Sequence, residues 1–218
     1  MEKSSNTMME DFGGRVASVW EGLRPATRHL VENALHSSPP AAAAGGAHAV
    51  TTGGRGIAYD TRAEWELSRL LAALDERARE GGARTLSVEQ TRDLSRLTET
   101  CASVLHVEAR SAEVFGQLLE RAVRARAYAR IDVLADTISA RLAPTEMCEL
   151  ARHADPSVRA VAREALAQVP TGVLVELLGD PVDADVARDA LEAQAAEFGS
   201  AEARWIVNAL DRADEDEI

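Results

Sequence analysis

A 25-residue repeat in the C-terminal half constrains the fold of this chain more than any other feature of its sequence. The segment Val161–Leu166 (VAREAL) returns 25 residues later as Val186–Leu191 (VARDAL). The pair Pro144-Thr145 returns 26 residues later as Pro170-Thr171. Two independent matches at nearly the same spacing indicate a repeated structural unit. Units of this length are typical of helical repeats, in which each unit buries its apolar face against its neighbours.

The first repeat predicts a short helix, a turn at an Asp-Pro pair and a longer helix. Asp155 is expected to accept hydrogen bonds from the free N–H groups of the longer helix, and Pro156 suits its first position. Apolar residues then recur with helical spacing from Val158 to Leu166, which predicts an amphipathic helix. In the second repeat, Gly199 and Ser200 predict the end of one helix and the start of the next.

The rest of the sequence also predicts helices. Hydrophobic residues make up 46% of the 218 residues but aromatic residues only 4%, so the apolar content is mostly Ala, Leu and Val. Ala and Leu, like the frequent Arg and Glu, are strong helix formers. Ser87 and Gln90 predict a capping box at the start of one helix. The pattern over residues 87–126 fits either one long helix or two. We therefore predict an all-α fold.

Four parts are expected along the chain. Residues 1–36 form an N-terminal arm whose first 13 residues are frayed and whose remainder is an amphipathic helix, either broken or divided in two. Residues 37–60, rich in Pro, Gly and Ala, form a flexible linker. Residues 61–213 form the folded helical part, and residues 214–218 form an acidic tail. The apolar residues expected to close the core at the C-terminal end are Trp205, Ile206, Ala209 and Leu210.

Residues 144–198 resemble the leucine-rich repeat variant and HEAT-like families of helical repeat proteins. The resemblance implies that residues 61–213 form a right-handed α-solenoid of short HEAT-like helical repeats. Members of the variant family can carry an iron–sulfur cluster on an N-terminal cysteine cluster; this chain has no such cysteines, so no cofactor is expected. The residues that carry the resemblance are Pro144-Thr145, Leu150-Ala151, Asp155-Pro156, Val158-Arg159 and Val161-Ala162, with Pro170-Thr171, Leu177-Leu178, Asp180-Pro181 and Val186-Ala187 in the second unit.

The charge is concentrated in the repeat region. The net charge is −12, and residues 143–218 carry 17 acidic and 6 basic residues. Such a surface favours a basic partner and repels phosphate backbones, although simple solubility also accounts for it. We predict a non-catalytic protein–protein interaction scaffold with no catalytic residues. Asp183 also fits a helix cap. The predicted partner-binding residues are Asp180, Asp183, Asp185, Asp189 and Glu192.

Two other functions stay open. A basic cluster comprises Arg121, Arg124, Arg126 and Arg130, with Tyr128 among them. Arg121, Arg124 and Tyr128 are expected to share one helical face. Such a face suits phosphate contacts and base stacking in nucleic-acid binding, which the acidity of the whole chain disfavours. The other possibility is an enzyme or lyase of HEAT-like architecture with a pocket that the sequence does not reveal.

The two cysteines predict neither a metal site nor a disulfide. Cys101–His106 and Cys148–His153 share a spacing of five, which places the two side chains about 140° apart on a helix. The side chains therefore diverge, and no metal is expected. Each cysteine is expected to be buried. No stretch is long and apolar enough to span a membrane, and a cytoplasmic, reducing location is expected.

Overall fold

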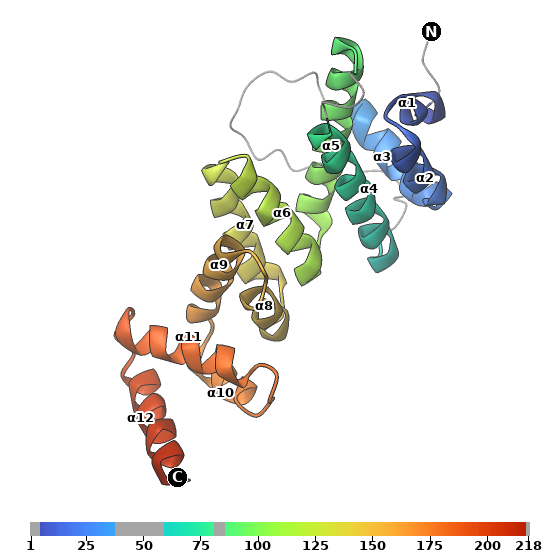
Figure 1. The fold of residues 1–218 in the computed structure, drawn as a ribbon. Coiled ribbons are helices and arrows are strands. Elements are labelled where there is room, and N and C mark those ends of the chain that lie inside the picture. Colours follow the sequence, from blue (N-terminus) through green and yellow to red (C-terminus); the bar gives the residue numbers. More distant parts are fainter. Residues whose placement is uncertain (1–4, 38–58, 81–85, 217–218) are drawn as a thin grey trace. The chain divides into compact units, whose positions relative to one another are not determined.

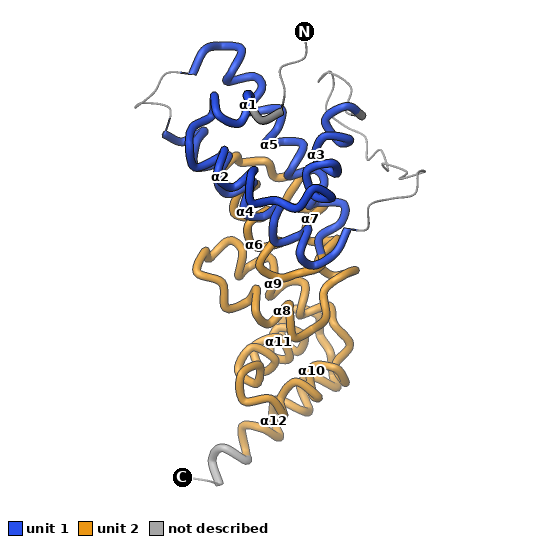
Figure 2. The backbone as a smooth tube through the Cα atoms, turned by 90° about the vertical axis from the view of Figure 1, so that its right-hand side faces the viewer, with its two compact units in different colours: residues 1–109 blue, residues 110–218 orange. Residues whose placement is uncertain are grey.

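The structure, a computed structural model, describes residues 5–37, 59–80 and 86–216 (Figure 1). Its elements over these ranges are α-helices joined by turns, with no β-strand, which confirms the all-α prediction. None of the helices in these ranges combines the length and apolar character needed to cross a lipid bilayer. The chain divides into two compact units, an N-terminal unit Met1–Ala109 and a C-terminal unit Arg110–Ile218 (Figure 2).

The N-terminal unit is built on a helical hairpin, α4 and α5. Helices α2 and α3 pack against α4, α3 also packs against α5, and α1 packs against α2. Ser87 and Gln90 form the predicted capping box at the start of α5. The helices of this unit are α1 (Ser5–Asp11), α2 (Gly14–Gly22), α3 (Pro25–Ser37), α4 (Thr61–Arg79) and α5 (Val88–Glu108).

The first residues of the chain are part of this core. Met9 and Phe12 are completely buried, as are Trp20 and Val31 further along the arm. The prediction that residues 1–13 are frayed is therefore wrong for the described residues 5–13. A helix as short as α1 shows little periodicity in the sequence and is held by tertiary packing instead. The predicted linker 37–60 lies almost entirely outside the described residues.

A buried carboxylate joins the arm to α4. Glu66 is 3% exposed. It accepts hydrogen bonds from the Thr27 hydroxyl (2.5 Å) and the main-chain N–H of Arg24 (3.3 Å). The guanidinium Nε atoms of Arg24 and Arg62 lie 3.3 and 3.2 Å from Glu66 Oε1. Burial raises the pKa of Glu66, but the bonds from Thr27 and Arg24 outweigh burial and leave that pKa below its ordinary value.

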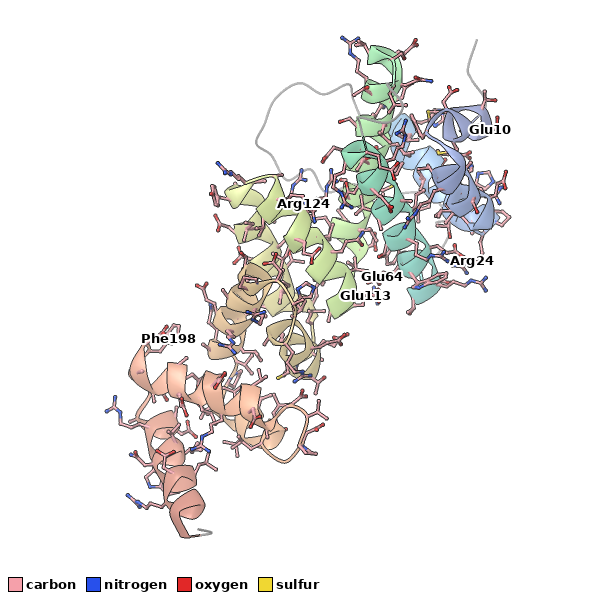
Figure 3. The ribbon with its side chains drawn as sticks, in the orientation of Figure 1. Glu10, Arg24, Glu64, Glu113, Arg124 and Phe198 are labelled. Carbon is pink, nitrogen blue, oxygen red and sulfur yellow. The ribbon has the colours of Figure 1, made fainter. Side chains whose placement is uncertain are left out.

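Asp60 extends this network at the start of α4. Arg24 donates two hydrogen bonds to its carboxylate, at 2.6 and 3.0 Å, and the Ala63 N–H donates a third at 2.7 Å. The Arg24 bonds, with the Ala63 N–H, lower the pKa of Asp60 from 3.8 to about 2. Asp60 is thus both the N-cap of α4 and an anchor for the turn between α2 and α3, where Arg24 is labelled in Figure 3.

We expect the N-terminal unit to lose stability in acid partly through Asp60. Its folded pKa lies below its unfolded value of about 3.9, so its contribution is present above about pH 4 and is lost as the pH falls toward 2. Asp60→Asn keeps a good N-cap but does not titrate. In a chain with Trp65→Phe and Trp205→Phe, the fluorescence of buried Trp20 follows urea unfolding of this unit. Between pH 5 and 2 the urea midpoint should fall more steeply with Asp60 than with Asp60→Asn; equal slopes would contradict this role.

The C-terminal unit consists of stacked helical hairpins. Helices α6, α8 and α10 pack against α7, α9 and α11 respectively. Successive hairpins also touch: α6 contacts α8 and α8 contacts α10, while α7 contacts α9 and α9 contacts α11. The last helix, α12, packs against α11 (Figure 1). The helices of this unit are α6 (Ala112–Arg124), α7 (Tyr128–Arg141), α8 (Pro144–Ala151), α9 (Pro156–Ala167), α10 (Thr171–Leu177), α11 (Ala184–Ala196) and α12 (Ala201–Asp216).

Matching positions of the two sequence repeats have matching environments. Ala162 and Ala187 are fully buried, and so are Leu166 and Leu191. Asp155 accepts a hydrogen bond from the N–H two residues later, as predicted, and Asp180 makes the same turn 25 residues further on. The similar segments therefore bury the same face and begin with the same turn.

Other helix ends test the sequence predictions directly. Gly199 has a positive φ of 68°, and Ser200 accepts a hydrogen bond from the Ala203 N–H, so the predicted end and restart are confirmed. The pattern over residues 87–126 forms two helices, because α5 ends at Glu108 and α6 begins at Ala112.

The predicted closing residues of α12 divide between its two faces. Trp205 is 73% exposed and Ala209 is also exposed, so their predicted burial is wrong. The face toward the core carries fully buried Ala203, with half-buried Ile206 and Leu210. Trp205 follows Ala203 by two residues, about 200° around the helix, and so faces away.

Candidate functional site

A groove lies between α9 and α11 in the described part of the C-terminal unit. Its volume is about 610 Å³, and it is partly open to solvent. The walls are two helices that pack together, and Phe198, just after α11, lies at one end (Figure 3). The lining residues are Ala160, Arg163, Glu164, Leu166 and Ala167 from α9, and Val186, Asp189, Ala190, Glu192, Ala193, Ala196, Glu197 and Phe198 from α11 and the residues after it.

Helical periodicity places the wall residues in line. On α9, the lining residues Ala160, Arg163, Glu164 and Ala167 follow the spacing i, i+3, i+4 and i+7, which marks one face of a helix. On α11, the lining residues Asp189, Glu192, Ala193 and Ala196 follow the same spacing. Both sets of residues line the same cavity, so these two helical faces border the groove.

The floor of the groove is apolar and made of small side chains. We call its apolar lining residues the floor: alanines from both helices, with the buried Leu166 and Val186. Phe198 adds an aromatic ring that is 57% exposed. Exposed aromatic side chains beside an apolar surface are typical of binding sites, since they bury much area at little conformational cost.

The rim of the groove is acidic. Four carboxylates, from Glu164, Asp189, Glu192 and Glu197, line the groove together with one guanidinium, that of Arg163. Arg163 Nη2 lies 3.3 Å from Asp189 Oδ2, which joins the two walls, and both side chains are about half exposed. Glu192 lies 3.4 Å from Arg188 Nε. The groove therefore combines an apolar floor with an excess of negative charge.

Two of the predicted partner-binding residues lie in this groove and three do not. Asp189 and Glu192 line it. Asp185 is exposed one turn before Asp189 on the same face of α11 but does not line the groove. Asp180 is exposed, and its Oδ1 accepts the Val182 N–H at 2.8 Å, so it stabilises the turn before α11.

Asp183 is a structural residue. It is 4% exposed, and its Oδ1 lies 2.7 Å from Nη1 of Arg152, which also donates to the Val182 carbonyl at 3.0 Å. Its side chain makes no capping bond to α11. Burial, with the negative charge of Asp183, raises the pKa of the Cys148 thiol to about 11. Asp183 is the N-cap residue of α11, as predicted, but its carboxylate makes no capping bond and instead joins α11 to the end of α8. Little of this residue is therefore accessible to a partner.

The sequence reasoning missed Glu164, Glu197 and Phe198. The available signal was the repeat itself, which aligns Glu164 with Asp189 at a spacing of 25 residues. That alignment places an acid at the same position on neighbouring hairpins.

The predicted basic cluster does not lie on one helix. Arg121 and Arg124 are in the last turn of α6, whereas Tyr128 begins α7, which also carries Arg130. Arg126 between them has a left-handed backbone (φ 53°), which reverses the chain. The predicted shared helical face is therefore wrong. Arg124, labelled in Figure 3, lies 3.7 Å from Glu120, and Tyr128 is 70% exposed.

The cysteines are buried, as predicted, and both are free thiols. Cys148 lies on α8, but His153 lies beyond the end of that helix, where its Nδ1 accepts the Asp155 N–H. Over the described ranges, no three His, Cys, Asp or Glu side chains gather in a way that would hold a metal ion.

The chain matches no protein-family model, no curated protein and no solved structure. The residues that line the groove are therefore the basis for inferring its role.

Proposed function

We propose that the protein is a non-catalytic scaffold that binds a basic protein partner in the groove between α9 and α11. The main support for this proposal is that one groove, between two packed helices, has both an acidic rim and an apolar floor. An apolar floor favours association by removing surface from water, and the carboxylates of the rim select and steer a partner of opposite charge.

The proposal includes the architecture. Stacked hairpins with matching buried positions support a right-handed α-solenoid of short HEAT-like or leucine-rich repeat variant units, which we propose for residues 61–213. Solenoids present long concave or grooved surfaces between successive repeats, and such surfaces commonly bind proteins. We also propose a cytoplasmic location, since two free, buried thiols fit a reducing compartment.

A random peptide display library, selected against the full chain at about 0.15 M ionic strength, tests this function. We expect the enriched peptides to combine Lys or Arg with apolar residues. The Glu164→Gln/Glu197→Gln double variant should bind them at least about fivefold more weakly, because two rim charges are removed.

A matched control removes the same charge elsewhere in the unit. Glu176 and Glu202 are exposed on α10 and α12, outside the groove. Glu176→Gln/Glu202→Gln should leave the affinity nearly unchanged. Enrichment of peptides without basic residues, or equal losses for both double variants, would overturn the proposal. Selective binding of RNA or DNA that is lost in Arg121→Ala/Arg124→Ala would favour the nucleic-acid hypothesis instead.

A further inference from the structure

We propose that the partner enters the groove as a single amphipathic α-helix with basic flanks, and that one of its Lys or Arg side chains replaces Arg163 as the partner of Asp189. This inference rests on the proposed function and specifies the form of the ligand. It follows from the backbone of the walls, the size of the floor residues and the position of the one groove arginine.

Within their helical interiors, the walls offer no free backbone hydrogen-bonding groups to a ligand. Both are α-helices, whose interior N–H and C=O groups bond to one another. An extended peptide in such a groove would leave its own backbone groups without protein partners on the buried side, at a free-energy cost for each. A helix satisfies its backbone internally and presents only side chains, which is the ligand form that suits a groove between helices.

The floor suits close helix packing. Ala160 and Ala167 on α9 and Ala193 and Ala196 on α11 all line the groove, and side chains this small allow a third helix to approach the two walls closely. The lining on α11 runs from Val186 to Glu197, which spans about 16 Å at 1.5 Å per residue. This length corresponds to about three helical turns of a partner.

Each wall of the groove carries a carboxylate that a basic flank of a bound helix would contact. Glu164 belongs to one wall and Glu197 to the other, so basic residues on both sides of an apolar stripe each meet a carboxylate. Glu164 and Glu197 form no ion pair with any residue that the structure describes. Phe198 lies at the end of the floor, where it can contact the apolar stripe.

Arg163 competes with such a ligand. Its guanidinium lies 3.3 Å from Asp189 across the groove, and both side chains are half exposed, so the pair is weak and replaceable. A ligand cation that pairs with Asp189 must displace Arg163. Removing Arg163 should therefore strengthen binding, whereas removal of an arginine elsewhere in the unit should not.

Fluorescence anisotropy with a synthetic peptide of about 18 residues tests the inference, a length at which an isolated helix begins to form. The peptide carries Leu and Ala on one helical face and Lys on both flanks; its comparison peptide has the same sequence with two adjacent D-residues at its centre, which break the helix. The full chain should bind the helical peptide at least about tenfold more tightly.

Arg163→Met should tighten binding of the helical peptide about threefold, and Phe198→Ala should weaken it about tenfold. Arg212→Met, on α12, should change it little.

The results of these binding measurements distinguish a wrong form of ligand from a wrong binding function. Equal affinities for the two peptides, with binding still weakened by Glu164→Gln/Glu197→Gln, overturn the helical ligand and leave the basic-partner proposal in place. Weaker binding by Arg163→Met overturns the displacement of Arg163. Absence of binding by both peptides, or binding insensitive to the two glutamates, overturns the inference and the proposed function together.

Discussion

Glu66→Ala is expected to lower the free energy of unfolding of the N-terminal unit by about 3 kcal/mol, within the range for breaking a buried charge network. The carboxylate is 3% exposed and accepts bonds from Thr27 and from the Arg24 N–H and guanidinium. Without it, the buried Thr27 hydroxyl and the part-buried Arg24 N–H lose their partner. The turn before α3 then keeps the Arg24–Asp60 attachment to α4. Urea unfolding followed by the fluorescence of Trp20, in the chain with Trp65→Phe and Trp205→Phe, measures the change.

Glu76→Ala is the matched control for Glu66→Ala. Glu76 is also on α4 and also pairs with an arginine of the arm, since Arg15 Nη1 lies 2.6 Å from its Oε1. This pair is exposed, with 67% of the Arg15 side chain accessible, and should contribute less than about 1 kcal/mol. Similar decreases in the free energy of unfolding for the two variants would contradict a special contribution from the buried Glu66 network.

Arg152→Ala is expected to destabilise the C-terminal unit by about 3 kcal/mol, because it leaves the buried carboxylate of Asp183 without its ionic partner. Amide hydrogen exchange of α9 under native conditions measures the opening of this unit. Arg163→Ala provides the comparison: its pair with Asp189 is half exposed and should contribute less than about 1 kcal/mol.

A second substitution identifies the cause of this loss. Arg152→Ala/Asp183→Asn removes the unpaired charge as well, so the double variant should be more stable than Arg152→Ala alone. A double variant less stable than the single would contradict a buried, uncompensated carboxylate as the cause. Substitutions of Asp183 are therefore expected to change the stability of the fold. Substitutions of Asp189 and Glu192 are expected to change the charge of the groove.

The local structure of the C-terminal unit could be predicted well from the sequence. The predicted turn at Asp155–Pro156 and the restart at Gly199-Ser200 depend on contacts between residues at most three apart. Such interactions are contained in the local sequence, and the repeat supplies a second example of the first turn at Asp180–Pro181.

Features set by distant contacts were not predictable. Residues 1–13 lack a long apolar period, yet Met9 and Phe12 are buried in the N-terminal unit. Trp205 is the largest apolar residue of α12, but its position relative to Ala203 places it on the exposed face. Hydrophobicity alone does not decide burial when a neighbouring residue sets the orientation of the helix.

The candidate site was predictable only on one of its two walls. A run of acids on one segment identified Asp189 and Glu192, but the groove also needs Glu164 from the preceding hairpin. The same run included Asp183, whose arginine partner lies 31 residues earlier in the sequence and is visible only once the hairpins are stacked. Charge composition indicates the sign of a surface, whereas the fold decides which charges are available to a partner.

The most direct test of the groove is a titration of the full chain with the tightest library peptide, followed by backbone amide chemical shifts. The account predicts that the largest changes fall on residues 160–167 and 186–198, on the two walls and at Phe198, and that they shrink in Glu164→Gln/Glu197→Gln. Changes centred on the turn that carries Arg124 and Tyr128, or on α12 alone, would contradict a binding site between α9 and α11.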